Sequence, residues 1–165
     1  MTIAESLLPE FDREMSTTRR LLERVPDDKL AWKPHDKSMS LGDLATHLSN
    51  LPSWGATTIT QSELNLAGMS NTPATSRTEL LSHFDTNVAN TRAALVGRLD
   101  PELMAPWTLK HGEQKLFTMP KLAVWRTFLM NHVIHHRGQL SVYLRLNDVP
   151  VPAMYGPSAD EAPTF

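Results

Sequence analysis

The stretch that most constrains the fold runs from Trp125 to Leu146, with the sequence WRTFLMNHVIHHRGQLSVYLRL. At about 100° of rotation per residue, this stretch is predicted to form one amphipathic helix. One face of that helix carries apolar side chains together with two histidines: Trp125, Phe128, Leu129, His132, His136, Leu140 and Tyr143. A chain that contains this helix needs other elements to cover the apolar face, and it must also supply partners for the imidazoles.

His132 and His136 stand one helical turn apart, so both rings can reach the same point in space. An H-x-x-x-H pair on a helix can present two nitrogens to one metal ion. The alternative is structural, because a single histidine on a core face is usually packed and hydrogen-bonded. Two histidines on one face favour metal binding over this structural role. His135 could replace or support one of the pair, and Gln139 could hydrogen-bond a ligand from behind.

The composition limits the chemistry that is available. The 165 residues suit one globular domain, here 1–165, with its own core. Cysteine is absent, so a metal must be held by His, Asp or Glu, and a thiol must come from a cosubstrate. The formal net charge is −2 and no basic run occurs, which argues against a nucleic-acid partner. No signal peptide and no membrane-length apolar run is found, so we expect a cytoplasmic protein without a membrane partner.

Apolar residues repeat at three and four positions in four segments, which predicts helices over residues 3–25, 40–60, 78–99 and 120–146. Ser40 is the expected N-cap of the second helix, with Asp43 completing a capping box. Pro52 should kink or divide that helix. His83 should face solvent.

Two segments break the helical pattern. Residues 64–76 are expected to form a polar loop. Residues 107–117 are expected to form two short strands around a turn at His111 and Gly112. This hairpin should pack on the helices through four candidate side chains: Trp107, Leu109, Leu116 or Phe117. Thr118 or Met119 should cap the last helix. The Pro-rich tail should be a docked extended segment.

Four helices and one hairpin predict a mainly α protein, most simply a four-helix bundle. His47 lies at the edge of the apolar arc of the second helix, where a histidine is more often structural than a ligand. However, His132 and His136 need at least one further ligand from another helix. Three histidines with open positions are typical of a catalytic metal site, whereas a closed structural site uses four protein ligands.

Three segments together resemble the DinB/YfiT-like family. These are WKPHDKSMSLGDLATHL on the second helix, NHVIHHRGQLSVYLRL on the last helix, and VPAMYGPSADE in the tail. The resemblance spans nearly the whole chain. It implies a four-helix bundle of up-down-down-up order, in which residues 64–76 supply the long crossover. It also implies a metal triad of one histidine on the second helix and the H-x-x-x-H pair, which match His47, His132 and His136.

The resemblance implies a metal-dependent enzyme. The wider superfamily includes thiol-dependent transferases and a thiol-dependent maleylpyruvate isomerase. We therefore expect a divalent transition metal, with zinc or nickel ahead of copper or iron. A low-molecular-weight thiol cosubstrate, a small-molecule substrate and a homodimer are also expected.

Two other functions remain open: a metal-dependent hydrolase, and a non-catalytic bundle that binds a metal or small ligand. Hydrolysis would need a nearby carboxylate to carry a proton, and the central histidine face of the last helix has none.

Overall fold

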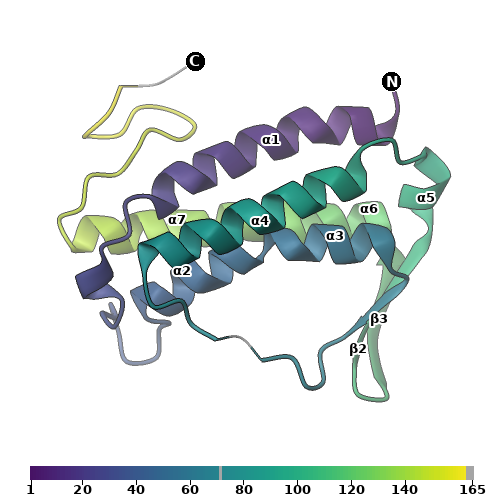
Figure 1. The fold of residues 1–165 in the computed structure, drawn as a ribbon, viewed down its shortest axis with the longest axis horizontal. Coiled ribbons are helices and arrows are strands. Elements are labelled where there is room, and N and C mark those ends of the chain that lie inside the picture. The colour runs from purple at the N-terminus through teal and green to yellow at the C-terminus, as the bar shows by residue number, and fades with distance from the viewer. Residues whose placement is uncertain (71, 163–165) are drawn as a thin grey trace.

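The computed structural model describes residues 1–70 and 72–162, which are mostly helical with one small sheet (Figure 1). The helices are α1 (Ile3–Leu22), η1 (Asp27–Lys29), α2 (Leu41–Asn50), α3 (Pro52–Thr60), α4 (Arg77–Leu95), α5 (Asp100–Met104), α6 (Lys121–Val124), η2 (Trp125–Met130) and α7 (Asn131–Leu146). The strands are β1 (Glu63–Asn65), β2 (Pro106–His111) and β3 (Gln114–Pro120). Within these ranges, no helix combines the length and the apolar character that crossing a bilayer requires.

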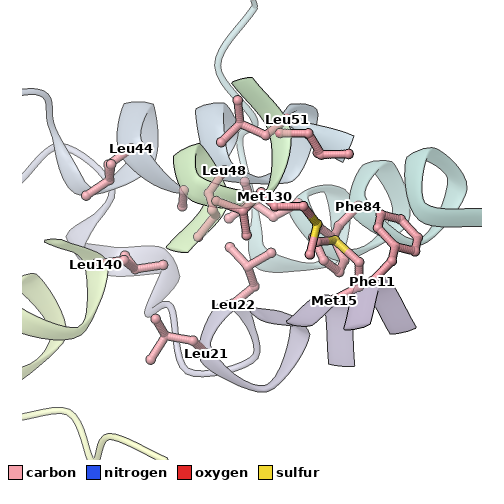
Figure 2. Packing of buried hydrophobic residues seen from close by; sticks show 14 of the residues in the cluster. Phe11, Met15, Leu21, Leu22, Leu44, Leu48, Leu51, Phe84, Met130 and Leu140 are labelled. Carbon is pink, nitrogen blue, oxygen red and sulfur yellow. The ribbon is translucent and has the colours of Figure 1, made fainter. Parts of the chain in front are cut away.

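The long helical segments lie side by side along the length of the molecule (Figure 1). α1 and the α6–η2–α7 segment run in one direction, and α2–α3 and α4 run in the other. The main core fills the space between them, with side chains such as Phe11, Leu48 and Phe84 pointing inward from three different helices (Figure 2). Burial of these apolar surfaces supplies most of the driving force for this arrangement.

The expected helices are present, with different ends. α1 stops at Leu22 instead of residue 25, and α4 covers 77–95 instead of 78–99. The predicted capping box is confirmed. The Ser40 hydroxyl accepts a hydrogen bond from the Asp43 amide at 3.0 Å, and the Asp43 carboxylate accepts one from the Ser40 amide at 3.3 Å.

Pro52 divides the second helical segment into α2 and α3, as predicted. The hydroxyl of Thr91, on α4, lies at the division. It donates a hydrogen bond to the Pro52 carbonyl at 2.5 Å and accepts one from the Ala56 amide at 3.0 Å. A side-chain hydroxyl thus stands between two backbone groups that an unbroken helix would join directly. Gly55 permits this close approach, because a Cβ there would lie 2.4 Å from Thr91 Cγ2.

The last helical segment differs from the uninterrupted helix expected over 120–146. β3 extends through Pro120, which is itself the N-cap residue of α6, so the expected cap at Thr118 or Met119 is wrong. The six residues of η2 form a π-helix, whose wider turns shift the register of the side chains. Trp125 and Leu129 therefore pack in the main core, whereas Phe128 packs in a second cluster and not on one continuous face with them.

The sheet has three strands instead of the two expected. β1 pairs in parallel with β2, so the predicted loop over 64–76 is wrong at its first residues. β2 and β3 form the expected antiparallel pair. Of the four candidate packing residues, Trp107 and Leu109 are buried and Phe117 packs against them, whereas Leu116 is 45% exposed.

The C-terminal tail docks in an extended form, as predicted, and buries Val151, Pro152 and Ala153. The Val151 amide donates a hydrogen bond to the Asp160 carboxylate at 2.9 Å, and the Ala153 amide donates one to Glu161 at 2.7 Å. These two acidic residues also pair with arginines of the helices: Glu161 with Arg20 and Asp160 with Arg145. The carboxylates therefore close the tail on itself and attach it to α1 and α7.

A buried ion pair joins α7 to α1. Arg137 directly follows His136 and is 1% exposed. Its Nη2 atom lies 2.6 Å from a carboxylate oxygen of Glu14, on α1. The Tyr155 hydroxyl of the tail donates to the same oxygen at 2.7 Å, and the Arg137 guanidinium lies 5.0 Å from the Tyr155 ring centroid. This pair positions the segment of α7 that carries the histidines.

Candidate metal centre

Three histidines from two helices come together on one side of the core. His47 comes from α2, and His132 and His136 come from α7. Each offers one nitrogen, and these atoms all lie within 4.8 Å of one another. All three residues are half-buried. Among the residues described, this is the group whose geometry suits a metal ion, and it contains no carboxylate.

The closest contact already has the spacing of two ligands on one ion. His47 Nε2 lies 3.3 Å from His132 Nε2. Two nitrogens bound tetrahedrally at about 2.0–2.1 Å from zinc would lie about 3.3–3.4 Å apart. The ring centroid of His136 lies 4.5 Å from that of His47 and 4.6 Å from that of His132. His136 therefore borders both of the other imidazoles.

A hydrogen bond on α7 sets the tautomer of His136. His136 Nδ1 lies 2.7 Å from the side-chain oxygen of Gln139, which can only accept, so Nδ1 carries the proton and Nε2 holds a lone pair. The ring of His132 is hydrogen-bonded to the backbone of Phe128. Such outer partners orient metal-binding imidazoles.

Burial favours the neutral, metal-binding form of each imidazole. The pKa of His47 is lowered to about 4, first by burial and then by the charges that His136 and His132 would carry. Burial is also the main cause of the lowered pKa of His132 and of His136, and their hydrogen bonds offset it only in part. All three rings are therefore neutral at neutral pH, as ligation requires.

The remaining histidines lie outside this group. His135, the rival candidate, is exposed, and its ring packs edge-on against His136 at 4.9 Å. His83 is exposed on α4, as expected. His111 is the last residue of β2, beside the turn, and is also exposed.

Two open clefts border the triad. The larger, of about 370 Å³, is lined by His47, Asn50, Leu51, Ser53, Trp54, Met69 and Ser70. The smaller, of about 340 Å³, is lined by Thr127, Phe128, Asn131, His132 and His135. Each cleft thus has one triad histidine and one aromatic ring in its wall. These volumes are typical of small-molecule sites.

Trp54 and Phe128 are site residues that the sequence analysis did not identify. Phe128 belongs to the predicted apolar face of the last helix, and Trp54 is not among the candidate residues of the second helix. Phe128 lies one helical turn from His132, and Trp54 lies two turns from His47. A core residue of either helix would have the same spacing, so the spacing does not identify these rings as site residues. Trp54 lies in the first turn of α3, just after the division at Pro52, and Phe128 lies in the π-helix η2.

The donor set fits a transition metal. Three neutral imidazole nitrogens suit zinc, nickel, copper or iron, whereas magnesium and calcium prefer oxygen ligands. With three protein ligands, positions remain open for water or a reactant. The adjoining clefts are where such a molecule would lie.

A family model described as the DinB family matches residues 1–163 of the chain. The uncharacterized protein YrdA of Bacillus subtilis (strain 168) is 25% identical over 166 residues, covering 98% of this chain and 93% of that protein.

Two solved structures have a similar fold, each at 24% sequence identity. A DinB-like protein from Bacillus cereus ATCC 10987 has a TM-score of 0.74, covering 93% of this chain and 98% of that one. The DinB-like protein YjoA from Bacillus subtilis has a TM-score of 0.67, covering 88% and 95%.

Proposed function

The chain belongs to the DinB family, and on this premise we propose that His47, His132 and His136 hold one divalent transition metal in a metal-dependent enzyme. The reaction type we propose is a transfer that joins a small thiol cosubstrate to an electrophile. The observation that carries the proposal is the convergence of three neutral imidazole nitrogens beside two open clefts. Zinc and nickel are the first candidates for the metal.

A divalent ion at this site would lower the pKa of a bound thiol and so supply a nucleophile near neutral pH. In the transfer, a bond forms from sulfur to the electrophilic carbon, and the bond to the leaving group breaks with its electron pair. The thiol proton passes to solvent. Gln139 holds His136 in its ligand tautomer, and the two clefts, one lined by His47 and the other by His132, accept the two reactants.

Both alternatives receive less support. A hydrolase needs a proton carrier near the metal, and no carboxylate lines either cleft among the residues described. A non-catalytic binding bundle does not need space for two reactants, whereas this chain has one cleft lined by His47 and another lined by His132.

Four finer features belong to the same proposal. They are a single domain over 1–165, a four-helix bundle of up-down-down-up order, a cytoplasmic location and a homodimer. The directions of the long helical segments support the bundle order (Figure 1). Sedimentation of the full chain at micromolar concentration tests the dimer, and a monomer would contradict it.

Metal analysis of the full chain, purified without a histidine tag, tests the site. We expect one equivalent of zinc or nickel per chain. His132→Ala and His136→Ala should abolish stoichiometric binding, and His47→Ala should weaken it strongly. His135→Ala is the matched control, because it removes an adjacent exposed imidazole and should leave the metal in place. If His135→Ala loses the metal while His136→Ala keeps it, the assignment is wrong.

A screen of small thiols against electrophiles, with metal-loaded protein, tests the reaction type. We expect thiol consumption to depend on the metal and to be lost in His132→Ala. Metal-independent turnover, or hydrolysis of an ester in the absence of thiol, would contradict a thiol transfer.

A further inference from the structure

The walls of the two clefts contain a fixed aromatic surface. The rings of Trp54 and Phe128 are nearly parallel, with an interplanar angle of 16° and centroids 6.4 Å apart. Phe117 stacks on Phe128 at 4.9 Å and 16°. Behind them, Trp107 is fully buried and contacts both Trp54 and Phe117. Trp54 and Phe128 are half-buried, so each has a supported side and a side open to a cleft.

The clefts lack fixed charge. Within the described part of the chain, neither is lined by Asp, Glu, Lys or Arg, and His135 is the one ionisable lining residue outside the triad. Apart from these imidazoles, the lining polar side chains are neutral amides and hydroxyls. A carboxylate or phosphate that entered would lose water without gaining a cationic side chain. The clefts therefore favour reactants that are uncharged apart from the atom that faces the metal.

The larger cleft has more apolar side chains in its wall than the smaller cleft has. Leu51, Trp54 and Met69 line it together with three small neutral polar residues. In the smaller cleft, Phe128 lies beside Thr127 and Asn131. A ligand with a flat aromatic ring would bury apolar surface and stack on Trp54. Neutral polar substituents on that ring could form hydrogen bonds with the amide and hydroxyl groups that line the cleft.

We propose that the larger cleft binds an uncharged electrophile with a flat aromatic group, which packs against Trp54 while its reactive atom faces His47. This assignment rests on the proposed function, because it names the substrate class of that same site. The smaller cleft then receives the thiol, whose remaining polar groups face Thr127 and Asn131. Trp54 is the specificity-determining residue in this arrangement.

Two inert probes of the same shape test the proposal: 3,5-dinitrobenzamide, which is neutral, and 3,5-dinitrobenzoate, which is charged. Their dissociation constants are measured by ligand-observed NMR titration of the full chain, both zinc-loaded and metal-free. In the metal-free protein we expect the amide to bind at least about tenfold more tightly than the carboxylate. Trp54→Ala should weaken amide binding by at least about fivefold, whereas Trp54→Phe should retain most of it.

A charge introduced into the cleft gives a second test that does not remove core packing. Met69 is exposed, so Met69→Lys should fold normally and should tighten carboxylate binding toward that of the amide. Leu116→Ala, an apolar truncation on β3 outside both clefts, is the control and should change neither affinity.

Zinc stoichiometry, measured on the same samples, separates the two proposals. A chain that binds zinc but treats the two probes equally overturns the substrate assignment and leaves the metal site intact. A chain that prefers the amide but binds no zinc overturns the proposed function and supports the cleft assignment. Unchanged amide affinity in folded Trp54→Ala also overturns the assignment. If Trp54→Ala does not fold, the probe comparison and Met69→Lys decide.

Discussion

Replacing Glu14 with glutamine should destabilise the protein strongly, because it removes the carboxylate that pairs with the buried guanidinium of Arg137. The two groups lie 2.6 Å apart, and Arg137 is 1% exposed, so water cannot reach the arginine after the change. Glu14→Gln keeps nearly the same shape. The loss therefore reports the unpaired charge and not a cavity.

The structure limits the size of the effect. Removing one partner of a buried ion pair costs about 3–5 kcal/mol of unfolding free energy. Here the guanidinium keeps hydrogen bonds to the Glu14 carbonyl at 3.1 Å and to the Thr18 hydroxyl at 3.3 Å. These bonds depend on the backbone and on a neighbouring residue, and they survive the substitution. We therefore expect the lower end of the range, about 3 kcal/mol.

Urea unfolding, followed by circular dichroism, measures this loss. In a protein of this size it corresponds to a fall in Tm of about 6–12 °C. Asp12→Asn is the matched control, because Asp12 pairs with Arg92 at 2.9 Å while the two side chains are 43% and 49% exposed. An exposed pair of this kind contributes less than about 1 kcal/mol.

A second substitution identifies the cause. Arg137→Met in the Glu14→Gln background removes the unpaired charge, so it should restore at least about half of the lost stability. Similar losses for Glu14→Gln and Asp12→Asn would refute the reasoning, because the energetic effect would then not depend on burial. A double variant that is less stable than Glu14→Gln would show that packing of the arginine stem, and not its charge, dominates.

Three further predictions follow from the site and the core. The pKa of His47 falls from about 6.5 in the unfolded chain to about 4 in the folded protein, so the metal-free protein should lose stability as the pH falls through this range and not above it. Thermal unfolding at several pH values should show a weaker pH dependence in His47→Asn, and equal slopes for the two proteins would count against this prediction. Gln139→Leu should weaken metal affinity by about 10–100-fold in a chelator competition, because His136 loses the partner that orients it, and an unchanged affinity would exclude that role. Gly55→Ala should lower the free energy of unfolding by about 1–2 kcal/mol, since its Cβ would lie 2.4 Å from Thr91 Cγ2 and overpacking exceeds the gain in helix propensity; equal or higher stability in urea would show that Thr91 can move.

The sequence predicted the features that depend on neighbours along the chain. Apolar spacing located the long helices. Pro52 located the division of the second helix and Ser40 located its start, because each residue acts through backbone hydrogen bonds within a few positions. The same local geometry predicted that His132 and His136 converge. The tail motif predicted docking, although it did not indicate which side chains would hold the tail.

The tertiary structure decided which surfaces meet. His47 lies 85 positions from His132, and only the packing of α2 against α7 brings their nitrogens to 3.3 Å. Helical periodicity of 3.6 residues could not predict the π-turns of η2, which separate Phe128 from the core face. Strand β1 has only three residues, and it forms because β2 offers an edge for pairing. The sequence thus determined which side chains share a face, and long-range packing determined what each face contacts, since burial depends on partners that are distant along the chain.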